Sequence, residues 1–507
     1  AGDASAMPNR CPATPLGDPL TGPRWNGWGA DLSNARFQPA AAAGLDARSV
    51  PKLKLRWAFG FPEGRNAFGQ PSVVGGRVYV GADTGFLYSL DAATGCVYWS
   101  FRADGGIRTA PTLGRIRPSG YAIYFGDLKA NVYAVDAASG ALLWKKRADP
   151  HPLARITGAP VLVDGRLYVP VSSLEEGVGA QPGYECCTFR GSVVAYDPAR
   201  GNQIWKTYTI PDPPKPRGKT SKGVQLWGPA GAAVWGSPTI DLRRRIMYVT
   251  TSNGYTQPAA DTSDAVMALD LETGRRLWVR QLTPGDAYLV GCAAGNENCP
   301  AEPGPDFAVG SSAILRTLPD GKNVLTVGQK SGLTYGIDAE DGTIRWTHRV
   351  GQGSTLGGVE WGGAADDQFA YFPNADARFG PEQAGGLAAV RVATGERAWF
   401  AKPTPACKEN KPECIPAQSA AATAIPGVVF SGFTDGMMRA YSTKDGTVLW
   451  EFQTNRPFET VNGVTAKGGS INGPGPTVVG GTLFVASGYS YLGMGMSGNV
   501  LLAFRPE

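Results

Sequence analysis

Apolar and polar residues alternate along most of the chain in short runs that are separated by glycine-rich turns. One pattern recurs: a strand-like run, a tight turn that contains Gly, and a second run that ends in Trp. Because alternate residues of a strand face opposite sides of a sheet, this pattern predicts half-buried β-hairpins in which Gly supplies a positive φ. The seven copies end at Trp99, Trp144, Trp205, Trp278, Trp346, Trp399 and Trp450.

The repeat predicts an all-β propeller built from four-stranded antiparallel blades with Trp-docking repeats. A further pair of strand-like runs precedes each copy, as QPSVVGG and RVYVGAD do before the first, so each unit contains four strands. The recurring Trp falls at one strand position, where it can fill the space between neighbouring blades, which widens outward. No stretch with helical periodicity exceeds a turn or two.

The eighth blade is expected to combine both ends of the chain. Residues 499–504 form a third strand with no Trp-bearing strand after it, and residues 53–59 form a Trp-bearing strand with no hairpin before it. Pairing the two completes the ring and removes the exposed sheet edges. The sequence therefore predicts one eight-bladed β-propeller over residues 25–507, preceded by an N-terminal extension over residues 1–24.

The long connections between strands are expected on one face of this propeller. In a four-stranded antiparallel blade with strands A to D, the A–B and C–D turns share one face, and the B–C turns and the D–A links between blades share the other. Function tends to lie on loops that a rigid scaffold holds, so we predict the functional site on the second face. The long B–C turns are 172–191, 252–264 and 373–386, and the long D–A links are 207–234, 281–307, 401–418 and 453–472.

The eight cysteines indicate an oxidising compartment. An even count with closely spaced pairs is typical of disulfides in a secreted chain, and the absence of a C-x-x-C pair disfavours metal binding by the thiols. The residues at the start of the sequence are small, as after signal-peptide cleavage, so we expect a periplasmic or secreted protein whose signal peptide has been removed. The expected pairs are Cys292–Cys299, Cys407–Cys414, the adjacent Cys186–Cys187 and, by elimination, Cys11–Cys96.

Composition excludes several classes of function. The net charge is only +5 and forms no basic stripe, so we expect no nucleic-acid partner. No apolar run is long enough to span a bilayer. The chain contains only two His, which disfavours a His-based metal site and a serine-hydrolase triad. The sequence contains no C-x-x-C-H motif to which a haem could be attached.

Several segments resemble the quinoprotein alcohol dehydrogenases that depend on pyrroloquinoline quinone (PQQ), most closely their polyvinyl-alcohol dehydrogenase branch. WNGWGADLSNARFQ, VPKLKLRWAFGFP and the Trp-ending repeats carry this resemblance from about residue 25 to residue 504. Non-enzymatic outer-membrane assembly scaffolds share the repeat, so the loop residues are more specific. The resemblance implies PQQ over the central channel with Ca²⁺ beside it. It also implies oxidation of a secondary alcohol, polymeric or bulky, to a ketone, with an external acceptor such as a cytochrome c.

The same resemblance implies roles for individual loop residues. SSLEEGVG matches the segment of a metal-ligating Glu, here Glu175, and TTSNGY that of a ligating Asn, here Asn253. PGPDFAVGSS supplies the catalytic base Asp306, which also faces the metal, and VGQKSGLTYGID supplies the cation Lys330 beside the quinone oxygens. These types suit the chemistry, because Ca²⁺ prefers oxygen ligands and acts as a Lewis acid, a carboxylate accepts the alcohol proton, and an ammonium stabilises developing negative charge.

The remaining implied contacts are to the cofactor. VWGSPTIDL places Trp235 under the cofactor rings, and GGIRTAPT and RITGAPV supply Arg108 and Thr157. In relatives an adjacent-Cys ring precedes the Arg-bearing strand, where this chain has Gly105 and Gly106. The pair Cys186 and Cys187 lies instead in the loop after Glu175, where it either reaches over the cofactor or only stiffens its loop.

Alternatives remain open from the sequence. Glu176 is as good a metal ligand as its neighbour Glu175, and Trp227, Trp361 and Tyr489 either line the pocket or pack within loops. A non-enzymatic scaffold that binds a protein or glycan is the main alternative function. A lyase or hydrolase that uses carboxylates is another, and it would need no electron acceptor.

Overall fold

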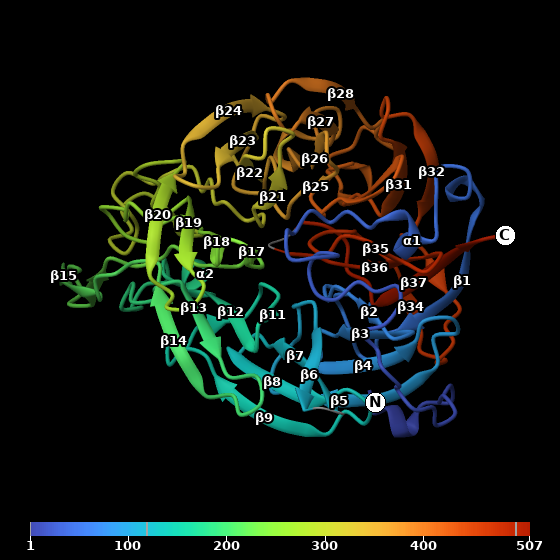
Figure 1. Cartoon of the computed structure of the whole chain (residues 1–507). Helices are drawn as coiled ribbons and strands as arrows, with labels where there is room; N and C mark the ends of the chain where they lie inside the picture. The colour runs from blue at the N-terminus through green and yellow to red at the C-terminus, as the bar shows by residue number, and fades with distance from the viewer. Residues whose placement is uncertain (1, 118–119, 492–493) are drawn as a thin grey trace.

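The computed structural model describes residues 2–117, 120–491 and 494–507, which form eight sheets arranged in a ring around a common axis (Figure 1). Seven sheets have four strands and the eighth has a short fifth strand, so the predicted eight-bladed β-propeller is confirmed. The only α-helices in these residues, α1 (Ala40–Ala43) and α2 (Glu175–Val178), are single turns, as the missing helical periodicity predicts. No helix in the described part of the chain has the length and apolar character to cross a membrane.

The first four blades follow one another along the chain, each with its strands in sequence order from the axis outward (Figure 1). The first holds β2 (Ser72–Val74), β3 (Arg77–Gly81), β4 (Phe86–Asp91) and β5 (Val97–Arg102), and the second β6 (Thr112–Arg117), β7 (Gly120–Gly126), β8 (Asn131–Asp136) and β9 (Leu142–Arg147). The third holds β10 (Ala154–Arg155), β11 (Val161–Val163), β12 (Arg166–Ser173), β13 (Ser192–Tyr196) and β14 (Gln203–Tyr208), and the fourth β17 (Thr239–Asp241), β18 (Ile246–Thr250), β19 (Ala265–Asp270) and β20 (Arg276–Gln281).

The last four blades end with the one that closes the ring. The fifth holds β21 (Ile314–Thr317), β22 (Asn323–Gly328), β23 (Leu333–Asp338) and β24 (Ile344–Arg349), and the sixth β25 (Ala364–Ala365), β26 (Phe369–Pro373), β27 (Leu387–Arg391) and β28 (Arg397–Ala401). The seventh holds β29 (Thr423–Ile425), β30 (Val428–Gly432), β31 (Met437–Ser442) and β32 (Val448–Gln453), and the eighth β35 (Thr477–Val479), β36 (Thr482–Ser487), β37 (Val500–Pro506) and β1 (Leu53–Gly60).

The eighth blade is shared by the two ends of the chain, as predicted. Strand β1 pairs antiparallel with β37 from Leu53 opposite Pro506 to Gly60 opposite Val500. A strand from the start of the propeller therefore becomes the outer strand of the last blade. Strand β37 is then paired along both of its edges, and β1 is paired along its inner edge.

The recurring Trp residues from Trp99 to Trp399 each pack against the Gly of the next blade's C–D turn, and Trp450, which precedes the shared blade, donates instead to the Leu53 carbonyl. A Cβ added to Gly140 would lie 2.6 Å from the Trp99 ring, and one added to Gly201 would lie 2.7 Å from the Trp144 ring. The indole of Trp144 also donates a hydrogen bond of 2.8 Å to the Pro198 carbonyl in that next blade. The Trp therefore fills the space between blades, and the Gly is required both for its positive φ and for the approach of the indole.

The long connections carry most of the additional elements of the loop face, and β10 lies in the shorter link before β11. Helix α2 lies in the B–C turn of the third blade. The hairpin of β15 (Lys215–Lys219) and β16 (Gln225–Gly228), which follows β14, projects from the rim of the propeller (Figure 1). The additional elements on D–A links are β15 with β16, η4 (Pro412–Cys414), and β33 (Pro457–Phe458) with β34 (Ala466–Lys467), whereas η3 (Ala377–Phe379) lies on a B–C turn. The predicted one-sided distribution of insertions is thus present in the structure.

Residues 2–24 are fastened to the first blade. The short helix η1 (Ala4–Ala6) packs against β5, and the Tyr88 hydroxyl donates to the Gly2 carbonyl at 3.0 Å. The Cys11–Cys96 disulfide joins the same two regions. All four predicted disulfides are present. The remaining short helix, η2 (Val50–Lys52), leads directly into β1.

Candidate functional site

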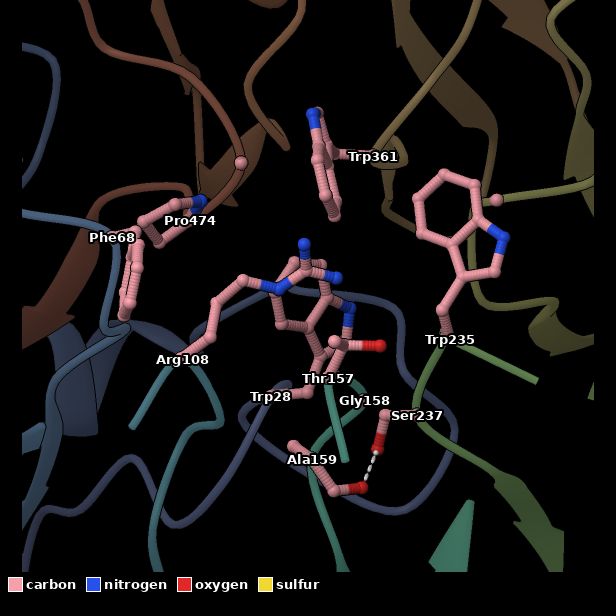
Figure 2. Close-up of a pocket in the computed structure, with 13 residues that line it drawn as sticks. Trp28, Phe68, Arg108, Thr157, Gly158, Ala159, Trp235, Ser237, Trp361 and Pro474 are labelled. Atoms are coloured by element: carbon pink, nitrogen blue, oxygen red, sulfur yellow. Dashed lines mark hydrogen bonds between the residues drawn. The ribbon is translucent and has the colours of Figure 1, made fainter. Parts of the chain in front are cut away.

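An aromatic pocket with an empty volume of about 370 Å³ lies near the propeller axis (Figure 2). The rings of Trp235 and Trp361 meet edge to face with centroids 5.0 Å apart. A Cβ on Gly310 would lie 2.0 Å from the Trp235 ring, so only Gly allows the indole its position. Flat apolar walls of this kind suit a planar ring system. The lining residues are Trp28, Phe68, Arg108, Thr157, Gly158, Ala159, Trp235, Gly236, Ser237, Gly310, Trp361, Gly473 and Pro474.

Arg108 brings positive charge into this pocket. Its guanidinium lies 4.6 Å from the Trp361 ring centroid and donates to the Tyr489 hydroxyl at 3.3 Å, and Figure 2 shows it extending between the aromatic walls. Burial lowers the pKa of the neighbouring Arg155, Tyr491 opposes this change, and the charge of Arg108 adds to it. Among the residues that the structure describes, neither Arg108 nor Arg155 forms an ion pair with a carboxylate, and two such cations suit a ligand that carries carboxylates.

Lys330 and Asp306 form a buried ion pair beside the pocket. The Lys330 ammonium lies 3.2 Å from both carboxylate oxygens of Asp306 and 5.9 Å from the Trp235 ring centroid. Burial lowers the pKa of Lys330, but the charges of Asp306, Glu360 and Glu176 outweigh it, so the net pKa lies above the ordinary value. Burial raises the pKa of Asp306, and the charge of Lys330 opposes that change. The pair thus combines a proton acceptor with a fixed cation at the edge of the aromatic pocket.

Asp286 holds the backbone on which Asp306 sits. Its carboxylate accepts hydrogen bonds from the amide of Asp306 at 3.2 Å and from the amide of Phe307 at 2.7 Å. Asp306 has a φ of 57°, a left-handed conformation that costs free energy for a residue with a Cβ. A Cβ on Gly304 would lie 2.1 Å from the Asp286 carboxylate, so this Gly lets the loop close over it.

Asn253 and Glu176 lie near the ion pair. Asn253 is fully buried and its amide nitrogen donates to the carbonyls of Gly254 and Tyr288, but its Oδ1 has no hydrogen-bond partner. Burial raises the pKa of Glu176, and the charge of Lys330 and a hydrogen bond from Asn253 oppose that change. Glu176, Asn253, Asp306 and Lys330 therefore belong to one cluster.

Glu175 points away from this cluster, although the resemblance places the metal-ligating Glu there. Its carboxylate accepts hydrogen bonds from the Tyr184 hydroxyl at 2.9 Å and from the amides of Thr188 and Phe189 at 2.9 and 2.8 Å. His151 Nε2 lies 3.3 Å away as a further partner. Adjacent residues on helix α2 point about 100° apart, so only one of the two glutamates can face the channel. The structure brings Glu176 to the cluster and uses Glu175 to tie its loop together.

The cluster fits a hard divalent cation. Glu176, Asp306 and Asn253 offer two carboxylates and an amide oxygen, which are the donor types that Ca²⁺ prefers. The buried Asn253 oxygen has no hydrogen-bond partner, and this observation favours a bound cation. Asp264 is fully buried with both carboxylate oxygens unpartnered, and burial followed by Asp286 and Asp306 raises its pKa well above the ordinary value. Within the described residues, no group of three or more His, Cys, Asp or Glu side chains is already arranged to hold a metal.

The adjacent disulfide Cys186–Cys187 does not line the aromatic pocket. Both residues are buried in a loop cluster with Leu289, and a Cβ on Gly179 would lie 3.1 Å from each sulfur. Their backbones exchange hydrogen bonds with Trp227, which joins the loop to β16. These contacts stiffen the loop of the Cys pair, and Trp227 packs there. Trp361, in contrast, lines the pocket, and Tyr489 contacts it.

Two comparisons by sequence identify the family. Residues 25–290 match the family PQQ, described as glucose/ethanol/alcohol dehydrogenase, beta-propeller domain, and residues 262–497 also match the outer membrane protein assembly factor BamB. A polyvinylalcohol dehydrogenase from Pseudomonas sp is 45% identical over 503 residues, covering 97% of this chain and 78% of the relative. One from Sphingopyxis sp. strain 113P3 is 42% identical, covering 96% and 76%.

Solved structures agree with the fold. The quinohemoprotein alcohol dehydrogenase of Comamonas testosteroni superposes with a TM-score of 0.69 at 19% identity, covering 99% of this chain and 83% of that chain. A europium-containing methanol dehydrogenase gives the same TM-score and identity, covering 97% and 99%. The family match and the two sequence relatives define a quinoprotein-type oxidoreductase on this propeller fold. The chain belongs to the PQQ-dependent quinoprotein alcohol dehydrogenase family, and it is a PQQ-dependent alcohol oxidoreductase.

Proposed function

We propose that this protein oxidises secondary alcohols, above all along a polyvinyl-alcohol-like polymer, to ketones with PQQ and Ca²⁺. The observation that carries the proposal is the buried Asp306–Lys330 ion pair, whose ammonium lies beside the Trp235 ring of the aromatic pocket. The polymeric substrate is inferred from the two relatives named polyvinylalcohol dehydrogenase. Bulky monomeric alcohols are the alternative substrates.

The residues of the site divide the work as follows. Trp235 and Trp361 would hold the planar cofactor, and Arg108 and Thr157 would orient its polar edge. When bound, PQQ supplies a two-electron acceptor and Ca²⁺ a Lewis acid.

Oxidation of the alcohol removes two electrons and two protons, and Asp306 accepts the hydroxyl proton. The ammonium of Lys330 stabilises negative charge that develops beside it. Glu176 and Asn253, together with Asp306, would hold the cation.

Two further features belong to the proposal. We propose a cytochrome c as the electron acceptor, because the oxidation of an alcohol to a ketone releases two electrons that an acceptor must take up. We also propose a periplasmic or secreted location, which the four disulfides support.

The test is a dye-linked assay on the purified chain, with polyvinyl alcohol and isopropanol as substrates and with PQQ and Ca²⁺ added or withheld. Dye reduction that requires both additions is the expected result. Asp306→Ala should lower kcat by roughly a thousandfold while retaining the quinone spectral shift, because the proton acceptor is lost but the aromatic pocket is intact.

Other outcomes separate the alternatives. Full activity of Asp306→Ala would refute the assigned base. Product formation without any electron acceptor would favour the lyase or hydrolase, and the absence of both turnover and quinone binding would favour the scaffold. Activity with PQQ that no divalent cation increases would contradict the proposed metal.

A further inference from the structure

A second, more open hollow lies on the same face as the aromatic pocket, with an empty volume of about 520 Å³. Its walls come from the end of β24, from the B–C turn after β26 and from the start of the link after β28, which are connections of the fifth and sixth blades. The residues that line it are Arg349, Val350, Gly351, Gln352, Asn374, Asp376, Gln383, Gly385, Phe400 and Lys402.

One link connects this hollow to the catalytic cluster. The D–A link begins after β24 at the outer edge of the fifth blade, where Gly351 and Gln352 line the hollow. In its middle, the amides of Ser354 and Gly358 donate to the Lys330 carbonyl at 3.2 and 2.9 Å. It ends at Trp361, which lines the aromatic pocket. The hollow therefore lies radially outward from the site, on a path that passes Lys330.

The charged groups that line the hollow are already bound by the protein itself. The Arg349 guanidinium donates to the carbonyls of Ser331, Gly351 and Gln352. The Asp376 carboxylate accepts from the amides of Gln352 and Gly353 and from the Asn374 side chain. The Lys402 ammonium donates to three consecutive carbonyls, those of Gln383, Ala384 and Gly385. An ionic ligand would have to displace these contacts.

What the hollow offers to a ligand is neutral and amphipathic. Gln352 Nε2 donates to Gln383 Oε1 at 2.8 Å, and both side chains are exposed, so their other amide groups face solvent. Phe400 is half-buried against Gly386 and provides an apolar wall. Amides that both donate and accept, beside an aromatic ring, match a chain in which hydroxyl groups alternate with methylene groups.

We propose that this hollow is a binding subsite for an extended, uncharged polyhydroxylated chain, one of whose carbinol carbons reacts beside Lys330 and Asp306. The subsite rests on the proposed function, because it presumes a polymeric alcohol. A short alcohol reaches only the reacting position and makes no contact in the hollow. Polymer and short alcohol should therefore respond differently to changes in the hollow.

The first variant is Gln383→Trp, which fills the hollow, and its matched control is Gln368→Trp in the same blade. Gln368 is exposed in the A–B turn, on the opposite face. For Gln383→Trp we expect the KM for polyvinyl alcohol to rise about tenfold, which corresponds to roughly 1.4 kcal/mol of lost binding. The kcat/KM for isopropanol should stay within about twofold of the parent value, and the control should match the parent for both substrates.

A binding measurement separates the subsite from the proposed function. Migration of the purified protein is measured in native gels with and without polyvinyl alcohol, with neither PQQ nor Ca²⁺ present. Polymer should retard the parent and the control more than Gln383→Trp or the smaller double variant Gln352→Ala/Gln383→Ala. Equal retardation and equal polymer KM across all four proteins would overturn the subsite. A parent that is retarded but oxidises no alcohol would instead contradict the proposed function and leave the subsite supported.

Discussion

The two faces of the propeller are built on opposite principles. On the C–D turn face, one device recurs around the ring: a Gly with positive φ packs under the Trp of the preceding blade, as Gly342 does under Trp278 and Gly395 under Trp346. On the loop face, each functional side chain occurs once. Lys330 occupies the turn position at which other blades carry Asp83, Leu128 and Thr434. Stability is thus distributed over equivalent contacts, whereas the chemistry depends on a few single residues.

This difference between the faces predicts that the same substitution at two adjacent loop residues has different effects. At one residue it should change the chemistry, and at the other it should change only the stability. Glu176→Gln should raise the Ca²⁺ concentration needed for half-maximal activity by about 100-fold, because a charged cation ligand is lost. Glu175→Gln should leave this concentration within about threefold but lower the free energy of unfolding by about 1–3 kcal/mol, because Glu175 accepts buried hydrogen bonds.

Two measurements check this pair: a calcium titration of dye-linked activity, and denaturant unfolding of the same preparations in chelator. The control is Glu185→Gln, an exposed glutamate of the same loop, which should change neither quantity. If Glu175→Gln weakens calcium binding and Glu176→Gln does not, the metal ligand is Glu175, as the family resemblance implies. The assignment of Glu176 from the geometry is then wrong.

A smaller effect is expected at Asp286, which acts through the backbone. Asp286→Ala leaves the amides of Asp306 and Phe307 without their acceptor and frees the loop from its left-handed conformation. We expect kcat to fall by about ten- to thirtyfold with the KM for isopropanol nearly unchanged, because the proton acceptor is misplaced but the pocket is intact.

Asp286→Asn retains one acceptor oxygen and should restore most of this kcat. Thermal unfolding of the two variants supplies the control, since a general loss of stability would lower the Tm of both without separating their kcat values. An equal kcat for Asp286→Ala and the parent would show that Asp306 holds its position without this support.

The sequence predicts the scaffold better than the site for a physical reason. Blade count, the shared eighth blade and the Trp–Gly docking each leave a repeated trace, so strand periodicity is enough to find them. Asp286 and Glu360 leave no such trace, because each acts from a non-repeating link. The family resemblance predicts six residues of one site, and in the structure they lie in the same region. These residues are Arg108, Thr157, Trp235, Asn253, Asp306 and Lys330.

Two details could not be resolved from the sequence because they depend on direction rather than on residue type. The adjacent residues Glu175 and Glu176 in the motif do not indicate which side chain faces the channel once helix α2 has formed. An adjacent-Cys pair does not indicate what its loop packs against, which here is Leu289. Both outcomes are set by the hydrogen bonds of the surrounding loop, such as those that Glu175 accepts.

The smallest effect concerns the repeated face and tests whether its stability is truly shared. Gly342 and Gly321 lie in the same blade, both with positive φ, but Gly342 lies under Trp278 and Gly321 has no neighbouring atom within 4 Å. Gly321→Ala should cost about 1 kcal/mol of unfolding free energy from backbone strain alone. Gly342→Ala should cost about 1–2 kcal/mol more, because its Cβ would lie 2.7 Å from the Trp278 ring. Denaturant unfolding measures both, and the kcat of each folded variant should equal that of the parent, because seven other blade boundaries still hold the ring. Equal destabilisation by the two substitutions would mean that the Trp–Gly contact adjusts freely, and a fall in kcat for Gly342→Ala would mean that the two faces are coupled rather than independent.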